Sequence, residues 1–152
     1  MEHYDQEKAA RVWQRVRGEE PREGLPLPAA EEQLAGLYRS LGRLVPGPVP
    51  GQLEQECNNH ASTVRGIWSL VGTPRPPMKQ AEVTKTTAPA LLGTCYSRTL
   101  RAIGEYERFS DHPEYGCAFR ILAEQKRQQA CRLLGLLGSL KQGSGNPPRS
   151  RT

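Results

Sequence analysis

The sequence predicts an all-α protein, and three observations point to this fold class. Aromatic residues make up 6% of the 152 residues and the mean hydropathy is -0.65, so a core would consist of Leu, Ala and Val beneath long polar faces, which suits helices. Apolar residues recur at steps of three and four over long segments. Most of the 13 prolines, together with about half of the 15 glycines, lie in 18–28, 46–51, 72–77 and 143–148, which predicts connections there. A chain of this length forms one domain.

A short helix is expected near the N-terminus, from Asp5 to Arg17. Its apolar stripe consists of Ala9, Val12, Trp13 and Val16. We expect Trp13 to dock this helix onto the main body. Prolines follow from Pro21 to Pro28, so residues 1–28 are predicted to form an N-terminal helix and a Pro-rich linker.

Two long helices are predicted next, separated by the turn at Pro46-Gly47-Pro48. The first spans roughly 29–45, and its stripe consists of Leu27, Glu31, Leu34, Tyr38, Leu41 and Val45. The second begins near Pro50 and ends at Gly72, and its stripe consists of Leu53, Cys57, His60, Val64, Ile67 and Val71. The following residues, 73–87, carry no apolar periodicity. A connection of this length predicts a crossover between the second and third bundle helices.

The second half of the chain predicts two more helices. The third stripe consists of Leu92, Cys95, Thr99, Ala102, Tyr106 and Phe109. The turn at 110–113 closes that helix, with Asp111 or Ser110 as the predicted N-cap of the next one. The last stripe consists of Phe119, Leu122, Lys126, Gln129, Leu133, Leu136 and Leu140. The bundle is therefore expected over 29–140, followed by a disordered basic tail over 141–152.

An internal repeat supports two helix pairs joined by the crossover. A shift of 68 residues aligns Tyr38 with Tyr106 and Glu31 with Thr99. A shift of 69 aligns Leu53, His60, Ala61 and Gly66 with Leu122, Gln129, Ala130 and Gly135.

Polar residues interrupt all four apolar stripes at places where a packed core would carry Leu or Ile. They are Glu31, Cys57, His60, Thr99, Lys126 and Gln129. Buried polar side chains are costly unless they pair or bind something, so these positions mark a site or what is left of one. Two stand alone, each seven residues before a Tyr, and the other four form two pairs spaced i, i+3.

This arrangement, together with several short motifs, resembles the ferritin-like superfamily, more specifically rubrerythrin-type proteins. The motifs are Glu31 with Tyr38, Glu56-Cys57-Asn58-Asn59-His60 followed by Gly66-Ile67, Glu105-Tyr106-Glu107, Asp111-His112-Pro113-Glu114-Tyr115-Gly116, and Leu122-Ala123-Glu124-Gln125-Lys126. The resemblance covers about 29–140 and implies a dimeric four-helix bundle with a non-haem di-iron centre that stores iron or reduces peroxide. Of the six ligand positions that it implies, Glu31 and His60 are retained, whereas Cys57, Thr99, Lys126 and Gln129 depart from the pattern.

These departures predict a degraded di-iron site. Three of four carboxylates are lost and a lysine is added where a metal charge would lie, so no cofactor is expected, and iron only if the site survives. We expect the Lys126 ammonium to pair with Glu31, with His60, Gln129 and Thr99 completing the hydrogen bonds. Tyr38 and Tyr106 are expected in the core with their hydroxyls tied to this layer. The predicted function is a non-catalytic structural or interaction module that forms a homodimer.

Other readings of the same residues stay open on the sequence alone. Glu31, beside Glu32, is also compatible with a solvated acid in the first turn of a helix. Lys126 is also compatible with a side chain that reaches the surface. Cys57 and His60, with Cys95 nearby, are compatible with a single zinc ion.

A different helix register would change the site. It would turn acidic residues inward on the second, third and fourth helices, namely Glu56, Glu105, Glu107 and Glu124. The protein would then be a peroxide reductase or iron-binding protein.

Charge and composition exclude some function classes. The net charge is +5, but basic residues are scattered among acids, which does not favour nucleic-acid binding; a basic helical nucleic-acid module is the weakest alternative. No membrane span or signal peptide is expected, so we predict a cytoplasmic protein. The single cysteines Cys57, Cys95, Cys117 and Cys131 are each expected to be small buried hydrophobes without disulfides. The sequence contains no phosphate-binding loop or hydrolase motif, so it does not favour an enzymatic function.

Overall fold

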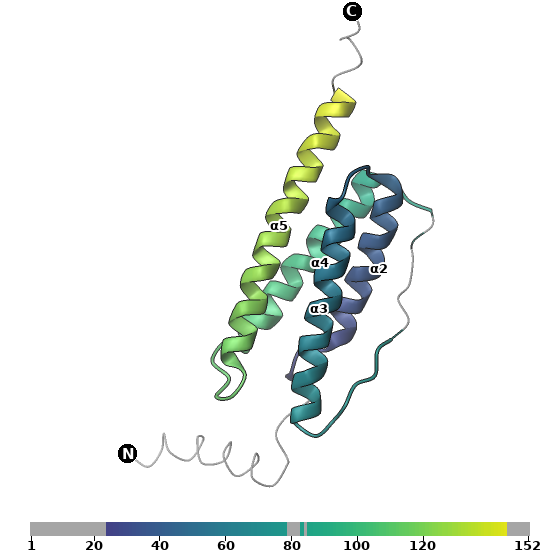
Figure 1. Ribbon diagram of the computed structural model, residues 1–152. Helices are drawn as coiled ribbons and strands as arrows, with labels where there is room; N and C mark the ends of the chain where they lie inside the picture. Colours follow the sequence, from purple (N-terminus) through teal and green to yellow (C-terminus); the bar gives the residue numbers. More distant parts are fainter. Residues whose placement is uncertain (1–23, 79–82, 84, 146–152) are drawn as a thin grey trace, which may run out of the picture.

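The computed structural model describes residues 24–78, 83 and 85–145, and its regular structure consists of four helices (Figure 1). They are α2 (Pro28–Leu44), α3 (Val49–Leu70), α4 (Ala88–Arg108) and α5 (Gly116–Gly145). No strand occurs in this part of the chain, which confirms the all-α class. The helix predicted over 5–17 lies outside the described residues. The predicted tail begins too early, because α5 continues through residues 141–145.

Local sequence signals explain where the helices begin and end. A proline lies in the first turn of α2, α3 and α4, where its missing N–H leaves no intrahelical bond unmade. Thr87 caps α4 by accepting a hydrogen bond from the Ala90 N–H. Helix α3 ends at Leu70. Gly72 follows with a φ of 90°, which favours glycine, and the Thr73 N–H closes the last turn on the Trp68 carbonyl.

The predicted N-cap of the last helix is wrong. Neither Ser110 nor Asp111 lies directly before α5, which begins only at Gly116. The intervening turn instead uses the His112 ring, whose Nδ1 accepts the backbone N–H groups of Glu114 and Tyr115, each at 3.1 Å.

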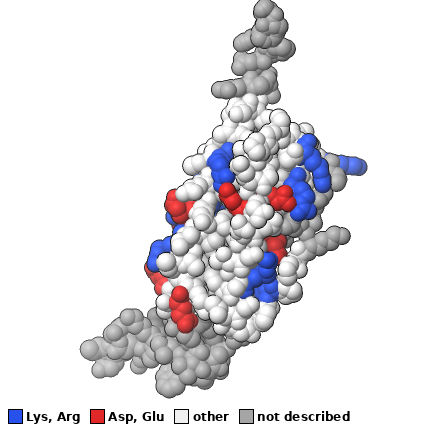
Figure 2. Space-filling model, viewed as in Figure 1, with Lys and Arg blue, Asp and Glu red and all other residues white. Residues whose placement is uncertain are grey.

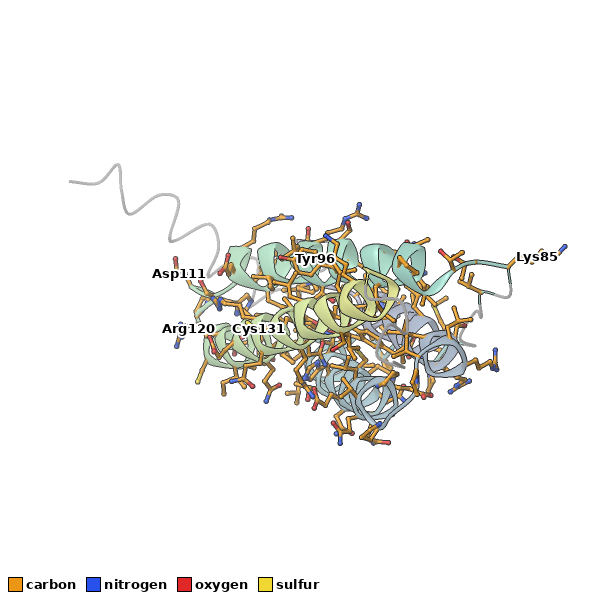
Figure 3. All side chains as sticks on the ribbon, turned by 90° about the horizontal axis from the view of Figure 1, so that it is seen from above. Lys85, Tyr96, Asp111, Arg120 and Cys131 are labelled. Carbon is orange, nitrogen blue, oxygen red and sulfur yellow. The ribbon has the colours of Figure 1, made fainter. Side chains whose placement is uncertain are left out.

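The four helices form two hairpins, α2 with α3 and α4 with α5 (Figure 1). Helix α3 ends at one end of the bundle and α4 begins at the other, so α3 and α4 run parallel and a crossover connection joins the two hairpins. Two buried side chains of α2 hold this connection: Glu32 accepts the Met78 N–H and Ser40 accepts the Val83 N–H. Seen from above, Lys85 projects away from the bundle at the edge of this connection (Figure 3).

The apolar core consists of two separate clusters. One cluster packs around Tyr38, and its other main members are Leu34, Leu41, Leu53, Leu92, Cys95 and Leu133. The other packs around Trp68, with Val64, Ala102, Tyr106, Phe119 and Leu122. Every helix carries at least one buried polar residue between the two clusters, and these residues form the layer described next.

Candidate functional site

A buried polar layer crosses the bundle between the two apolar clusters. Its members are Glu31 on α2, His60 on α3, Thr99 on α4, and Lys126 and Gln129 on α5. His60 is 6% exposed and the other four side chains belong to residues with no exposed surface. Each one occupies a stripe position of its helix, so the helical repeat that buries the neighbouring Leu and Val residues also turns it inward.

The centre of the layer is an ion pair. Lys126 Nζ lies 2.5 Å from Glu31 Oε1, and it also donates to Gln129 Oε1 at 2.9 Å and to Cys57 Sγ at 3.3 Å. The pairing expected between Lys126 and Glu31 is therefore confirmed. The alternatives in which Lys126 reaches the surface, or Glu31 is a solvated acid, are wrong because both side chains are buried.

The surroundings keep Glu31 ionised. Burial alone raises the pKa of this carboxyl, but the Lys126 charge and the contacts with His60 outweigh burial, so the pKa lies below its ordinary value. Tyr106 donates a hydrogen bond to Glu31 Oε2 at 2.6 Å, which satisfies the second oxygen. Burial, followed by the Glu31 charge, raises the pKa of Tyr106, so its hydroxyl keeps its proton.

His60 connects the layer with the surface. Its Nδ1 lies 3.5 Å from Glu31 Oε1, yet both atoms lack a hydrogen bond of regular geometry within the described structure. The Lys126 contact with the same oxygen is thus an ion pair whose angles differ from those of a hydrogen bond. His60 also lines a cavity of about 360 Å³ between α3 and α5, whose other lining residues are Glu56, Asn59, Thr63, Gln125, Gln128 and Arg132.

Thr99 does not join the bonds around Lys126, contrary to expectation. Its hydroxyl lies 3.1 Å from the Tyr38 hydroxyl and donates to the Cys95 carbonyl of its own helix at 2.8 Å. The threonine side chain is short and its oxygen is already occupied by that carbonyl. Burial is the main reason that the pKa of Tyr38 is raised.

The two tyrosine bonds match the internal repeat. Tyr38 on α2 reaches Thr99 on α4, and Tyr106 on α4 reaches Glu31 on α2. The repeat aligns these same residues, Tyr38 with Tyr106 and Glu31 with Thr99. The tyrosine of each helix pair therefore bonds to the single polar residue of the other pair. This confirms the prediction that both tyrosine hydroxyls bond to the polar layer.

Glu56 and Arg132 extend the polar layer, although the apolar stripes did not predict this role for either residue. Glu56 accepts a hydrogen bond from Gln129 Nε2 at 3.0 Å and forms an ion pair with Arg132. Burial raises the pKa of Glu56, but the bonds from Arg132 and Gln129 outweigh this effect, so the pKa lies below its ordinary value. The available signal was the i, i+3 spacing of Gln129 and Arg132, which places both on one side of α5.

The alternative register is contradicted. Glu105, Glu107 and Glu124 do not point into the layer but pair with arginines at the surface. Glu56 is only partly buried and reaches the layer through Gln129. No second carboxylate therefore faces Glu31 in the polar layer.

The residues of the layer do not fit a metal centre. In the ranges that the structure describes, no group of three or more His, Cys, Asp or Glu side chains is placed to hold a metal ion. Burial raises the pKa of Cys57 to about 12, so this thiol faces Lys126 in its protonated form and not as the thiolate that zinc prefers.

The sequence predicted that all four cysteines are buried, and this prediction is wrong for two of them. Cys57 and Cys95 lie in the core, whereas Cys117 and Cys131 are exposed on α5, and all four thiols are free. Both exposed cysteines fall on the side of α5 opposite to Lys126, because they lie about half a helical turn out of phase with it.

The surface and the comparisons with known proteins give no further assignment. On the face in Figure 2, basic side chains stand beside acidic ones and do not form a continuous patch. None of the helices described is both long and apolar enough to cross a membrane. Comparisons with protein-family models, with curated proteins and with solved structures give no match to this chain.

Proposed function

We propose that this protein is a ferritin-like bundle of the rubrerythrin type whose di-iron centre has been replaced by a lysine, and that it acts as a non-catalytic structural or interaction module. The observation that carries this proposal is the position of Lys126 Nζ, 2.5 Å from Glu31 in the middle of the bundle. An ammonium there supplies the positive charge that a metal ion would otherwise bring to Glu31.

Charge balance supports a site without metal. The layer contains one carboxylate and one ammonium, which neutralise each other, whereas two iron ions would bring four to six positive charges with a single buried carboxylate to meet them. A metal ion entering this layer would also meet the Lys126 charge at short range. Structural support is the role that a neutralised interior still allows.

Metal analysis of the full chain purified without chelator is the first test. We expect substoichiometric iron, and the same thermal midpoint of unfolding with and without a chelator, because no metal contributes to folding. Two equivalents of iron per chain would overturn the proposal.

Restoring the missing ligands tests the ferritin-like part of the proposal separately. The variant Cys57→Glu, Thr99→Glu, Lys126→Glu, Gln129→His would regain two single carboxylates and two Glu-x-x-His pairs. We expect it to bind about two equivalents of Fe²⁺ or Co²⁺ per chain and to gain thermal stability with the metal. Gln129→His alone is the matched control and should bind none. A folded fourfold variant without metal affinity would contradict a ferritin-like origin of the layer.

A second copy of this chain is the proposed partner. Support comes from α4 and α5, which expose Leu100, Ile121 and Leu134 at 45–53%. Sedimentation analysis should show a homodimer that Ile121→Glu weakens, while Lys141→Glu, at another exposed position of the same helix, should not. A wild-type monomer at high concentration would refute the dimer. The four free cysteines suit a reducing compartment, so we place the protein in the cytoplasm.

A further inference from the structure

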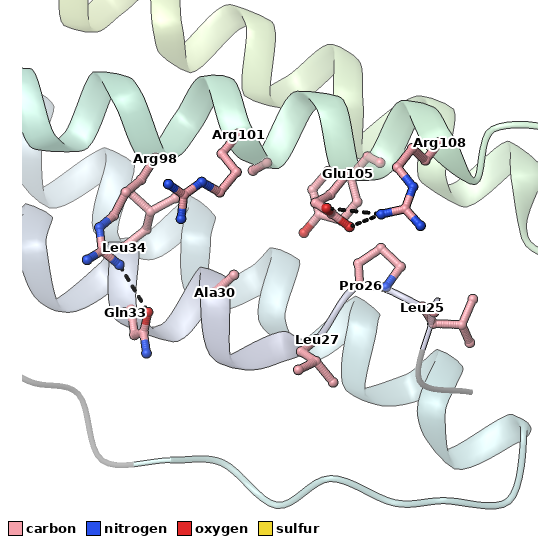
Figure 4. A pocket seen from close by; sticks show the side chains of 13 residues that line it. Leu25, Pro26, Leu27, Ala30, Gln33, Leu34, Arg98, Arg101, Glu105 and Arg108 are labelled. Atoms are coloured by element: carbon pink, nitrogen blue, oxygen red, sulfur yellow. Dashed lines mark hydrogen bonds and ion pairs between the residues drawn. The ribbon is translucent and has the colours of Figure 1, made fainter. Parts of the chain in front are cut away.

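A second cavity, of about 450 Å³, lies between α2 and α4 and shares no lining residue with the cavity beside His60 (Figure 4). It is a groove whose walls are mainly apolar, formed by Leu25, Leu27, Ala30, Leu34, Ala102 and Tyr106. Leu27 is 45% exposed there, although the neighbouring residues Leu25 and Leu34 are buried. An apolar groove with an exposed leucine on its edge is suited to accept an apolar side chain.

Three arginines of α4 stand along this groove. Arg98 donates to Gln33 at 3.1 Å and Arg108 pairs with Glu105 at 3.3 Å. Arg101 lies between them and, in Figure 4, extends from α4 over the groove without a bond to any residue drawn. No hydrogen bond or ion pair joins its side chain to any residue within the described ranges. The groove therefore offers an apolar floor and an uncompensated positive charge.

We propose that the groove is the docking site of this chain's own N-terminal segment, the amphipathic helix that the sequence predicts from Asp5 to Arg17. The chain enters the described structure at Gly24, which itself lines one end of the groove. Residues 18–23 bridge at most about 20 Å when extended, enough for the segment to fold back over the groove.

The dimensions of segment and groove agree. From Arg108 to Arg98 the groove follows ten residues of α4, or about 15 Å at the helical rise. A helix over 5–17 is about 20 Å long, and its apolar stripe of Val12, Trp13 and Val16 occupies the half nearer to Gly24. The stripe would therefore cover Leu27 and its apolar neighbours.

The charges fix the direction. With residue 17 at the Gly24 end, the segment runs antiparallel to α2, and its acidic first turn, which carries Asp5 and Glu7, reaches the end of the groove where Arg98 and Arg101 lie. These acids would supply the partner that Arg101 lacks. The same orientation brings Arg15 toward Glu105.

Chymotryptic cleavage after Trp13 tests the proposal on the full chain, because a docked helix is cut only when it opens. We expect Val12→Asp, which breaks the apolar stripe, and Arg101→Glu, which reverses the charge, to speed cleavage after Trp13 by about tenfold. The double variant Glu7→Arg with Arg101→Glu should return the rate to that of the wild type. Lys141→Glu, an exposed charge reversal remote from the groove, is the matched control and should leave the rate unchanged.

Two outcomes would overturn the proposal. Wild-type and Val12→Asp chains that are cut equally fast would mean that the segment does not dock. Protection that disappears on dilution would mean that a second copy supplies the segment or fills the groove. Circular dichroism of each variant verifies that the bundle stays folded, so that faster cleavage reports release of the segment and not unfolding.

Discussion

At the scale of single residues, the buried contact between Lys126 and Glu31 has the clearest energetic consequence. Removing one partner of a buried ion pair leaves the other charge without compensation in a poorly solvated interior. Lys126→Met should therefore lower the free energy of unfolding at pH 7 by about 3 kcal/mol, measured by urea denaturation. Lys141→Met, at the exposed end of α5, should change it little. Equal stability of Lys126→Met and the wild type would mean that the pair contributes nothing.

The pH dependence of that difference identifies Glu31 as the cause. In the wild type the pKa of Glu31 is lowered, so its contribution is present above the ordinary value of 4.5 and is lost as the pH falls through the folded-state pKa. Without Lys126 the effect of burial dominates and the pKa should rise, so the variant should regain stability as Glu31 takes up a proton. The gap in free energy of unfolding should be largest at neutral pH, begin to narrow as the pH falls through the raised pKa of the variant, and narrow further below 4.5 as the wild type loses its contribution.

The thiols should differ in reactivity as their exposure differs. Burial raises the pKa values of Cys57 and Cys95 to about 12, so neither forms appreciable thiolate at neutral pH. Labelling of the native protein with a thiol reagent should modify Cys117 and Cys131 quickly, and Cys57 and Cys95 only after denaturation. Mass spectrometry of the labelled peptides separates the sites. Rapid native labelling of Cys57 would show that the polar layer opens.

At the scale of elements, the start of α5 depends on a glycine. A Cβ at Gly116 would collide with the Ser110 carbonyl oxygen, to which Arg120 also donates. Gly116→Ala should lower the thermal midpoint, corresponding to about 1–3 kcal/mol, because the turn backbone must shift. Gly135→Ala is the matched control in the same helix: nothing lies within 4 Å of its Cβ, so it should stabilise by about 0.5–1 kcal/mol. Loss of stability only at Gly135 would contradict this account of the turn.

The helices were predictable because their apolar stripes are long and their boundaries carry proline or glycine. The helix expected over 29–45 is observed as Pro28–Leu44, and the positive φ of Gly72 accounts for the end of α3. The start of α5 was not predictable in the same way. Ser110 and Asp111 are good capping residues in general, but here a histidine ring accepts the turn's backbone N–H groups.

The site was predictable to the extent that polar residues interrupted a regular stripe. That pattern placed Glu31, His60, Lys126 and Gln129 in one layer, because the repeat fixes which side of a helix faces the core. It did not determine which of them bond. The Thr99 hydroxyl donates to the Cys95 carbonyl of its own helix. Glu56 lies outside the stripe but contacts the layer because the long side chain of Gln129 reaches it. Such choices depend on side-chain length and rotamer, which periodicity does not encode.

At the scale of the whole molecule, the polar layer separates two apolar clusters that would otherwise form one core. The triple variant Glu31→Leu, Lys126→Met, Tyr106→Phe removes both charges and the hydroxyl that bonds Glu31. Because apolar residues of similar volume often replace a buried ion pair without loss, we expect the triple variant to unfold at least as high in urea as the wild type, and clearly above Lys126→Met. A triple variant as unstable as the single one would mean that the polar layer is required for packing.

The two charges lie on different hairpins, and this placement also determines which hairpins can associate with each other. The α2–α3 hairpin contributes the carboxylate and the α4–α5 hairpin contributes the ammonium. Two copies of the first hairpin, associated in the same manner, would bring two anions together in the interior, and two copies of the second would bring two cations together. A protein cut between residues 78 and 83 should therefore reassemble from unlike fragments in preference to like ones, with electrostatics acting as the means of self-recognition.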